Sequence, residues 1–323
     1  MIIPKYWAES RVQHPLGTKQ ISVRRFGWSM LSAADAQFNA DARASEALKR
    51  ILSGEALIKR EPKLPYNGAE GVPIREEIVE QFGETIITRN SYGARCLNSP
   101  NVFFADVDFN EGTSCSLTMR MIGILSAAAL LLAWWTGSGM VAIVLLVLAI
   151  PAGNLLAWAI NRSFINSNGG SEEIALARVR NFIGKNPNWN VRIYRTPIGM
   201  RVLATHQTFD PNEPIVAECF KEIAADRRYV VMCERQACFR ARVSPKPWRI
   251  GISQRLRGGV WPIDDHRMFH RKAWIDQYEF VSTSYASCKF IESIGSGMVH
   301  NEIRDVIEVH DRLSQANSTL PIA

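Results

Sequence analysis

Cysteine is scarce in this sequence, with six residues in 323. Six scattered cysteines are too few for the disulfide framework that stabilises small secreted domains. The first ten residues, MIIPKYWAES, also lack the pattern of a signal peptide. We therefore expect free thiols in a reducing compartment, and secretion is disfavoured.

Recognisable nucleophile and zinc motifs are missing as well. No serine or cysteine stands in a nucleophile elbow, which disfavours a hydrolase of the Ser-His-Asp or Cys-His type. Cys233 and Cys238 are separated from His266 and His270 by 27 residues, a gap much longer than in common zinc fingers. We expect three other histidines to be ordinary surface or packing residues: His14, His300 and His310.

Charged side chains are absent from residues 121–160, a stretch of forty positions. One membrane crossing needs about 20 apolar residues, so this stretch suits two crossings. The Thr-Gly-Ser-Gly sequence at residues 136–139 supplies a turn between them. The sequence therefore predicts a transmembrane hairpin over residues 119–161, with spans at about 121–138 and 140–160. The alternative is a buried hairpin of a soluble core.

Aromatic and basic residues mark the borders of this hairpin. Trp134 and Trp135 lie beside the turn and Trp158 near the opposite border, where amphipathic rings prefer the lipid headgroups. Arg120 and Arg162 bracket the apolar stretch, whereas the turn carries no charge. By the positive-inside tendency we expect a protein of the inner (cell) membrane with two spans and both termini in the cytoplasm.

A hairpin returns the chain to the side that it left, so residues 1–118 and 162–323 can form one cytoplasmic unit. Alternating and helical hydrophobic patterns follow one another in both parts. The predicted fold class is an α+β soluble domain interrupted by a two-helix transmembrane hairpin, with a sheet assembled from both parts. Expected helices cover residues 32–54, 74–83, 171–187 and 299–315; expected strands or hairpins cover 19–29, 84–98, 101–109, 189–206 and 278–291; residues 65–73 are expected to form a loop and 316–323 to fray.

The net charge of +7 lies mostly in the second part, where residues 163–323 hold 22 basic and 17 acidic side chains. Within that part, residues 227–272 hold 12 basic side chains and only three acidic ones. Such a stretch favours anionic partners: phosphates, nucleic acids or acidic lipid headgroups.

Basic and aromatic residues interleave within this stretch. Arg240 and Arg242 share one face of an expected strand, and the following SPKPWR segment carries Lys246, Trp248 and Arg249. Such a surface can bind a phosphate backbone and stack a base. It can equally lie against acidic lipid headgroups, or form a solvated basic face beside the membrane.

Two segments with similar spacing form expected arginine hairpins. ITRNSYGARCL and IYRTPIGMRVL share five residues at equal offsets, and each places two arginines around a turn glycine. The pairs are Arg89 with Arg95 and Arg195 with Arg201. Across the two arms of a hairpin, such a pair can bind a phosphate. The alternative is that these arginines are solvated charges on strand edges.

Two carboxylates end the apolar segment NVFFADVDF, residues 101–109. On a strand, Asp106 and Asp108 point to one face about 6 to 7 Å apart, close enough to hold one divalent ion or a pair of them. Oxygen ligands of this kind suit Mg²⁺ or Mn²⁺. Without a cation the two acids repel each other and one takes up a proton, unless they are solvated or pair with nearby arginines.

The order of these features resembles the archaeo-eukaryotic primase superfamily, over roughly residues 84–210. In that family an apolar strand ends in Asp-x-Asp, a helix follows, and a later strand ends in small-x-His. The matching segments here are FADVDF, the helix from residue 171, and VLATH. The resemblance implies a divalent metal held by Asp106 and Asp108, and a contact between His206 and the phosphates of an incoming nucleotide.

The sequence departs from that family in two respects. The family's third acid has no clear counterpart, with Asp264 and Asp276 as candidates, and a membrane hairpin separates the first motif from its helix. Polymerase activity therefore does not follow from the resemblance. Glycosyltransferases also use Asp-x-Asp after an apolar strand and would predict manganese-dependent binding of a sugar nucleotide, but their usual opening strand and nucleotide loop are missing here.

Together these features predict an integral membrane protein with a cytoplasmic nucleotide or nucleic-acid binding domain. Metal-bound carboxylates and arginines would then support phosphoryl transfer by offsetting phosphate charge. The competing prediction is a non-enzymatic membrane module that binds a protein partner or acidic lipid through its basic stretch. The sequence leaves open whether the chain is an enzyme.

Overall fold

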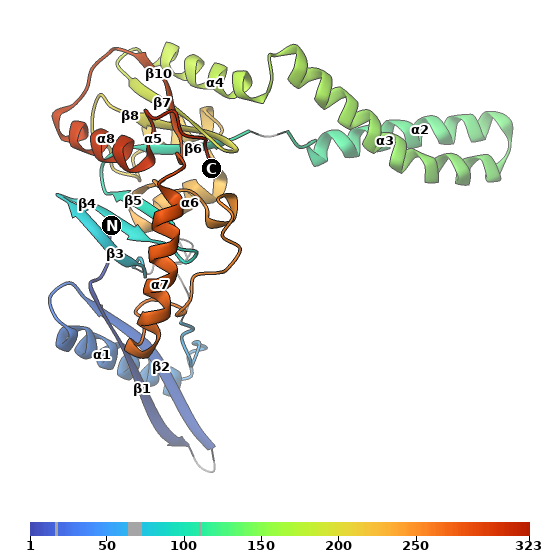
Figure 1. Cartoon of the computed structure of the whole chain (residues 1–323). Coiled ribbons are helices and arrows are strands. Elements are labelled where there is room, and N and C mark those ends of the chain that lie inside the picture. Colours follow the sequence, from blue (N-terminus) through green and yellow to red (C-terminus); the bar gives the residue numbers. More distant parts are fainter. Residues whose placement is uncertain (17–18, 64–72, 110) are drawn as a thin grey trace.

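The two longest apolar helices of the chain project from a mixed body of helices and antiparallel sheets (Figure 1). The loop predicted at residues 65–73 lies, apart from Pro73, outside the described residues. This computed structural model describes residues 1–16, 19–63, 73–109 and 111–323.

The N-terminal part is a long two-stranded ribbon with one helix beside it (Figure 1). Strands β1 (Tyr6–Leu16) and β2 (Lys19–Ser29) pair antiparallel, and α1 (Ala33–Leu52) packs on them. The helix begins where predicted because the Ser32 hydroxyl accepts a hydrogen bond from the amide of Asp35. Its buried face consists of alanines at three- or four-residue spacing, which lets the helix approach the ribbon closely.

The first of two larger sheets has the strand order β3-β4-β5-β9. The pairing of β4 with β5 confirms the hairpin predicted over residues 84–98. The strands are β3 (Glu77–Phe82), β4 (Thr85–Arg89), β5 (Arg95–Ser99) and β9 (Phe239–Arg242).

The helix predicted over residues 74–83 was wrong, because this segment contains β3. Its charged residues favour a helix, but Ile78 and Val79 are β-branched and suit a strand. Gly83, with a positive φ of 56°, then allows a tight turn into β4. Pairing with β4 thus overrides the local preference of the segment.

The second sheet has the strand order β10-β7-β8-β6. Its strands confirm the hairpin predicted over residues 189–206 and the strand predicted within 101–109. Because β5 pairs with β9 and β6 with β8, both sheets join strands that precede the apolar helices to strands that follow them. The strands are β6 (Phe104–Asp108), β7 (Asn190–Thr196), β8 (Gly199–Ala204) and β10 (Lys289–Gly295).

Helices α2 (Cys115–Thr136) and α3 (Gly139–Ser167) are long and apolar enough to cross a membrane. They pack on each other and extend away from the sheets (Figure 1). Gly137, with φ 66°, ends α2, and the Ser138 hydroxyl caps α3 by accepting from the amide of Val141. Large apolar side chains on both helices are exposed, unlike those of a helix in a soluble core.

The remaining helices cover the two sheets and the ends of their strands (Figure 1). The helices predicted over residues 171–187 and 299–315 are confirmed in α4 and α8. Aromatic side chains such as Phe103, Phe104 and Phe239 fill the main core. The helices are α4 (Ser171–Lys185), α5 (Pro214–Glu222), α6 (Arg227–Gln236), the short 3₁₀ helix η1 (Pro247–Arg249), α7 (Asp265–Ser282) and α8 (Asn301–Ser314).

Two predictions near the C-terminus were wrong. Residues 278–291 do not form strands throughout, because α7 ends and β10 begins within them. Residues 316–323 do not fray, because the tail pairs with the backbone of Ala286. The amide of Ala286 donates to the carbonyl of Pro321 at 2.9 Å, and the amide of Ala323 donates to the carbonyl of Ala286 at 2.9 Å.

Candidate functional site

Asp106, the first of the two predicted metal-binding acids, forms an ion pair with Arg201. The two residues are directly opposite in the register of β6 and β8. Arg201 Nε donates to Asp106 Oδ1 at 2.9 Å and Nη2 to Oδ2 at 3.4 Å. Although burial opposes the guanidinium charge, Asp106 raises the pKa of Arg201 above its ordinary value. Arg201 is only 2% exposed, so it depends on this carboxylate for compensation.

Asp108 lies at the exposed end of β6 beside a carboxyl group that the sequence analysis did not include, that of Asp226. Asp226 caps α6, and its backbone amide donates to the carbonyl of Asp106 at 2.9 Å. Partial burial, the charges of Asp226 and Asp106, and a hydrogen bond to Asp226 raise the pKa of Asp108. Asp108 therefore holds a proton more tightly than an isolated aspartate does.

The third acid of this group is neither of the two predicted candidates. Asp264 is the residue before α7 and Asp276 lies within that helix. Asp226 stands directly before the amphipathic helix α6, and Asp is a preferred N-cap residue. This position was the sequence feature that could have identified it.

Arg201 occupies one of the two carboxyl groups that are predicted to hold a divalent metal. Both oxygens of Asp106 face this guanidinium, so a metal at Asp106 would have to displace it. Among the residues that the structure describes, no group of three His, Cys, Asp or Glu side chains could hold a metal ion. Binding of Mg²⁺ or Mn²⁺ by Asp106 and Asp108 stays a prediction.

Three basic side chains gather opposite these acids, and we call them the cation cluster: Arg242 at the end of β9, Lys246, and Arg249 in η1. Partial burial and the charges of Arg242 and Arg249 lower the pKa of Lys246, whereas Asp108 and Asp106 act on it in the opposite sense. Partial burial and Arg242 likewise lower the pKa of Arg249. The three positive charges are therefore close enough to repel one another.

The cation cluster has no carboxylate at ion-pair distance in the described part of the chain. Arg242 Nε and Arg249 Nη1 are buried and have no hydrogen-bond partner among the described residues. A buried donor without a partner is costly. An incoming anion could accept these hydrogen bonds and balance the charge.

Aromatic side chains border the cation cluster. Trp248 is 56% exposed, and the Lys246 ammonium lies 5.4 Å from the centre of its ring. The ring of Tyr92 meets the Trp248 ring edge-on, with 5.2 Å between their centres. Burial raises the pKa of Tyr92, and its phenol hydrogen-bonds to Arg242. An exposed indole face therefore adjoins unpaired positive charge.

Arg240 differs from Arg242 although both belong to β9. Its Nη2 donates to both carboxylate oxygens of Glu76, at 2.8 and 2.7 Å, and both side chains are buried. Arg240 is thus part of a structural ion pair in the first sheet rather than of the cation cluster.

The first arginine hairpin brings its two arginines together, but their charges are compensated. Arg89 and Arg95 are directly opposite in the register of β4 and β5. Both reach Glu279 on α7, at 2.8 and 3.5 Å, and Arg89 also lies 3.9 Å from Glu77. In the described structure these arginines join α7 to the sheet.

The second arginine hairpin separates its arginines. The register of β7 and β8 places Arg195 opposite Met200 and Arg201 opposite Tyr194, so the two arginines point to opposite faces of the sheet. Arg195 instead pairs with Glu172 at 3.3 Å. The similar spacing in the two segments therefore does not give a similar structure.

His206 lies far from the acids with which the family resemblance would group it. The antiparallel register sets Gly199, at the start of β8, beside Asp108. His206 follows the opposite end of β8. The six residues of this strand, Gly199–Ala204, span about 16 Å from one end to the other. It is buried, which lowers its pKa, and its Nδ1 lies 3.3 Å from the donating amide of Asn190.

A buried group next to Arg201 also escaped the sequence analysis. His310 Nε2 lies 4.0 Å from Cys288 Sγ and 3.3 Å from Arg201 Nη1, and its Nδ1 lies 3.0 Å from Asp311 Oδ1. Cys, His and Asp also occur together in the active sites of cysteine-nucleophile enzymes, but Cys288 and His310 are each 0% exposed. Both are buried beside Arg201, and neither is exposed to a substrate.

The six cysteines, all within the described residues, are unpaired. Comparison of this chain with protein-family models, with curated proteins and with solved structures finds no match in any of the three.

Proposed function

We propose that this chain is a two-span membrane protein whose α+β body binds a phosphate-bearing ligand of the nucleotide or nucleic-acid class at the cation cluster. The observation that supports this most directly is the set of three neighbouring cations without a carboxylate partner in the described chain. Trp248, exposed beside them, would stack on a base.

The charge of the cluster is unusual for this molecule. Elsewhere, Arg89, Arg201 and Arg240 each have a carboxylate at hydrogen-bond distance. Arg75, which is also buried, instead lies 4.2 Å from the centres of the Trp7 and Phe26 rings. Holding three cations together without an ion-pair partner costs free energy through mutual repulsion and lost hydration, and Asp108 and Asp106 offset this cost only in part. A phosphate would offset both costs, because its oxygens accept charge-assisted hydrogen bonds from several donors at once.

The proposal places the body on the cytoplasmic side of the inner membrane. Helices α2 and α3 would cross the bilayer as a hairpin, so residues 1–118 and 162–323 form one domain that the hairpin interrupts. Arg120 and Arg162 at the ends of the apolar stretch favour this orientation. Both larger sheets contain strands from before and after the hairpin, so these two parts must lie on the same side of the membrane.

Phosphoryl transfer is not part of the proposal, because the two carboxyl groups predicted to bind its metal ion interact with other side chains. Asp106 pairs with Arg201, and Asp108 shares its hydrogen bond with Asp226. The binding that we propose requires only the cation cluster and Trp248.

An acidic lipid headgroup is the second candidate ligand, because the cluster lies close to the start of the apolar hairpin. Asp108, which acts electrostatically on Lys246, ends β6 only seven positions before α2 begins at Cys115. Seven extended residues span at most about 24 Å. A headgroup at the bilayer surface would offer the same phosphate chemistry without a base.

Calorimetry on the full chain in neutral detergent tests the proposal. We expect adenosine and guanosine triphosphates or a short single-stranded oligonucleotide to bind without added metal. The variant Arg242→Gln/Lys246→Gln/Arg249→Gln should lose at least tenfold in affinity. The control Arg178→Gln removes an exposed basic side chain on α4 and should change little.

Free glycerophosphoglycerol, a soluble phospholipid headgroup, separates the two candidates. Binding of this headgroup with no binding of nucleotides or oligonucleotide would replace the nucleotide class by the lipid class. Absence of binding by every probe, or equal losses in the triple variant and in Arg178→Gln, would contradict phosphate binding at the cluster. Repeating the titrations with Mg²⁺ or Mn²⁺ would show whether a metal contributes through Asp108.

A further inference from the structure

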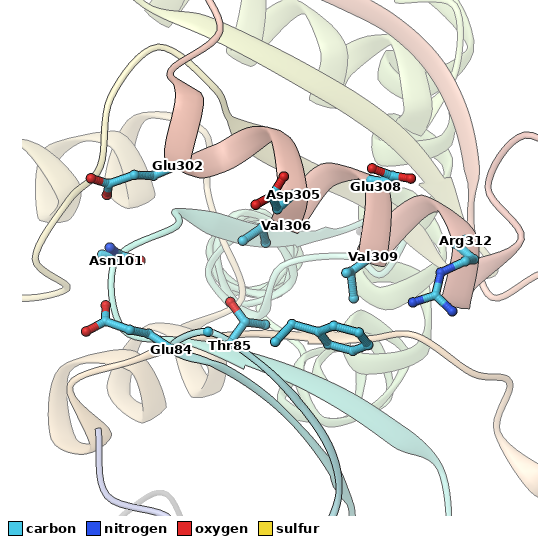
Figure 2. Close-up of a pocket in the computed structure, with 11 residues that line it drawn as sticks. Glu84, Thr85, Asn101, Glu302, Asp305, Val306, Glu308, Val309 and Arg312 are labelled. Atoms are coloured by element: carbon cyan, nitrogen blue, oxygen red, sulfur yellow. The ribbon is translucent and has the colours of Figure 1, made fainter.

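A cavity of about 780 Å³ lies between α8 and the turn that joins β3 to β4. Figure 2 shows α8 above this turn, with side chains from both elements around the space between them. Pockets for small molecules usually occupy about 300 to 1,000 Å³. The cavity is therefore large enough for a small organic ligand, and none of its lining residues belongs to the cation cluster.

The cavity is strongly acidic. Glu302, Asp305 and Glu308 reach it from α8, and Glu84 from the turn, against one basic residue, Arg312. In the described part of the chain none of these four acids takes part in an ion pair. The cavity therefore carries uncompensated negative charge.

The three acids of α8 have mixed effects on the helix. Glu302 lies in the first turn of α8, where the helix dipole favours an acid. Asp305 and Glu308 are each three residues from the previous acid, a spacing at which like charges repel. Arg304 and Arg312, each four residues from Glu308, reduce this repulsion. A cation in the cavity would relieve this repulsion.

The inner wall of the cavity adds an unpartnered hydroxyl and apolar surface. Thr85 is 4% exposed; its hydroxyl makes no hydrogen bond to the described residues, and its oxygen is open to the cavity rather than closed off from solvent. Figure 2 shows the Thr85 oxygen directed toward α8. Val306 and Val309 face the same space (Figure 2). Phe82 also lines it, and the Arg312 guanidinium lies 5.6 Å from the centre of the Phe82 ring. A ligand that donates a hydrogen bond would satisfy the hydroxyl.

The distribution of the acids decides which kind of cation fits. No three of the described His, Cys, Asp or Glu side chains converge closely enough to hold a metal ion. The carboxylates are instead spread along α8 and across to the turn, with valine side chains between them (Figure 2). An extended ligand with separate positive groups can reach several of them, whereas a single small ion cannot.

We propose that this cavity binds a small aliphatic polyamine. Its ammonium groups would donate hydrogen bonds to the carboxylates of α8 and Glu84, and one would also donate to the Thr85 hydroxyl. Its methylene segments would pack on Val306, Val309 and Phe82. The inference is independent of phosphate binding at the cation cluster, because it concerns a different surface and a ligand of opposite charge.

Calorimetric titration of the full chain with spermidine, in neutral detergent and low salt, tests this inference. We expect Glu302→Gln/Asp305→Asn to weaken binding by at least tenfold. The control Glu218→Gln/Glu234→Gln removes two exposed carboxylates from α5 and α6 and should leave the affinity within about twofold. The comparison holds total charge constant, so only the position of the lost acids differs.

Thr85→Val distinguishes a built site from general attraction to negative charge. The substitution keeps the shape of the side chain and removes only the hydroxyl, so we expect about a fivefold loss of spermidine affinity. Circular dichroism and thermal unfolding would verify that each variant is folded. Loss of spermidine binding with a variant that remains folded would support the inference.

Three results in the spermidine titrations would overturn the inference: no binding of spermidine to the full chain; equal weakening by the cavity and control double variants; or displacement of spermidine by Mg²⁺ at equal charge concentration. Preferential binding of a tetralysine peptide, with none of spermidine, would assign the surface to a basic protein segment and would also overturn it.

Discussion

Basic side chains in the interior of this protein and those of the cation cluster meet negative charge in opposite ways. Arg240 donates to both oxygens of Glu76, at 2.8 and 2.7 Å. The cation cluster, by contrast, has no carboxylate at ion-pair distance within the described residues. Buried pairs of this kind balance arginine with a carboxylate, whereas buried Arg75 packs on aromatic rings instead. For the cation cluster we propose that a bound phosphate supplies the balancing charge.

Removing the carboxylate of a buried pair should have the largest effect on stability. In Glu76→Gln the Arg240 guanidinium stays buried and loses the carboxylate charge of Glu76, so the free energy of unfolding should fall by about 3–5 kcal/mol. Urea unfolding of the full chain in detergent, followed by tryptophan fluorescence, measures this change. The double variant Glu76→Gln/Arg240→Met should regain much of the loss, because no buried charge is left unpaired. A loss below about 1 kcal/mol would contradict the assigned role of the pair.

The acids beside the cluster should give a smaller effect that depends on pH. The pKa of Asp108 is raised above its ordinary value of 3.8, so the folded protein holds the proton more tightly than the unfolded chain. The stability contributed by the protonated acid is complete below the ordinary pKa and is lost as pH rises through the raised pKa. Asp108→Asn keeps a neutral side chain and should remove this loss.

Urea unfolding at several values between about pH 4 and 7 would test the Asp108 prediction. The stability of Asp108→Asn relative to the unchanged protein should increase across this interval. Asp276→Asn, which changes an exposed acid on α7, serves as the control and should show no such trend. A parallel dependence in the two variants would contradict the raised pKa.

Removing one member of the cation cluster should have the smallest effect, with the opposite sign to the Glu76 variant. Lys246→Gln relieves repulsion from Arg242 and Arg249, so the free energy of unfolding should stay unchanged or rise by less than about 1 kcal/mol. The same unfolding measurement applies. A clear loss of stability would mean that Lys246 has a structural partner, and the distinction between the two groups of cations would fail.

The second comparison within the molecule, between the arginine hairpins, explains where the sequence argument failed. Five residues, 90–94, separate Arg89 from Arg95, which are paired in register. In the other hairpin Thr196 pairs with Gly199, so the loop has only two residues, 197 and 198. An odd and an even loop give registers that differ by one position, and one position reverses the face of every side chain. Equal spacing along the sequence therefore could not reveal which arginines face each other.

Local features were predictable where local physics governs them. The helix predicted over residues 32–54 begins directly after Ser32 because a hydroxyl before an amphipathic segment accepts from the free amides of the first turn. The apolar helices were predictable from forty uncharged positions. The segment containing β3 was predicted wrongly because its pairing with β4 outweighs its helix-favouring charges.

The candidate site was only partly visible for a similar reason. Lys246, Trp248 and Arg249 are neighbours in the sequence and were found together. Asp226 and Asp108 are distant in the sequence and meet only because the start of α6 lies beside β6. Thr85 and Glu302 meet at the acidic cavity through the packing of α8 on the first sheet. Contacts between distant segments carry no local pattern that would announce them.

The sequence by itself determined the apolar hairpin, the excess of positive charge in the second part and most of the individual strands and helices, because hydrophobicity and backbone preference are properties of short segments. Only the tertiary structure decided which charges are balanced. Whether Arg201 is a ligand-binding residue or the partner of Asp106 depends on strand register and burial. These arise from the whole fold, since a charge must find its counter-charge among all the side chains that packing brings near it.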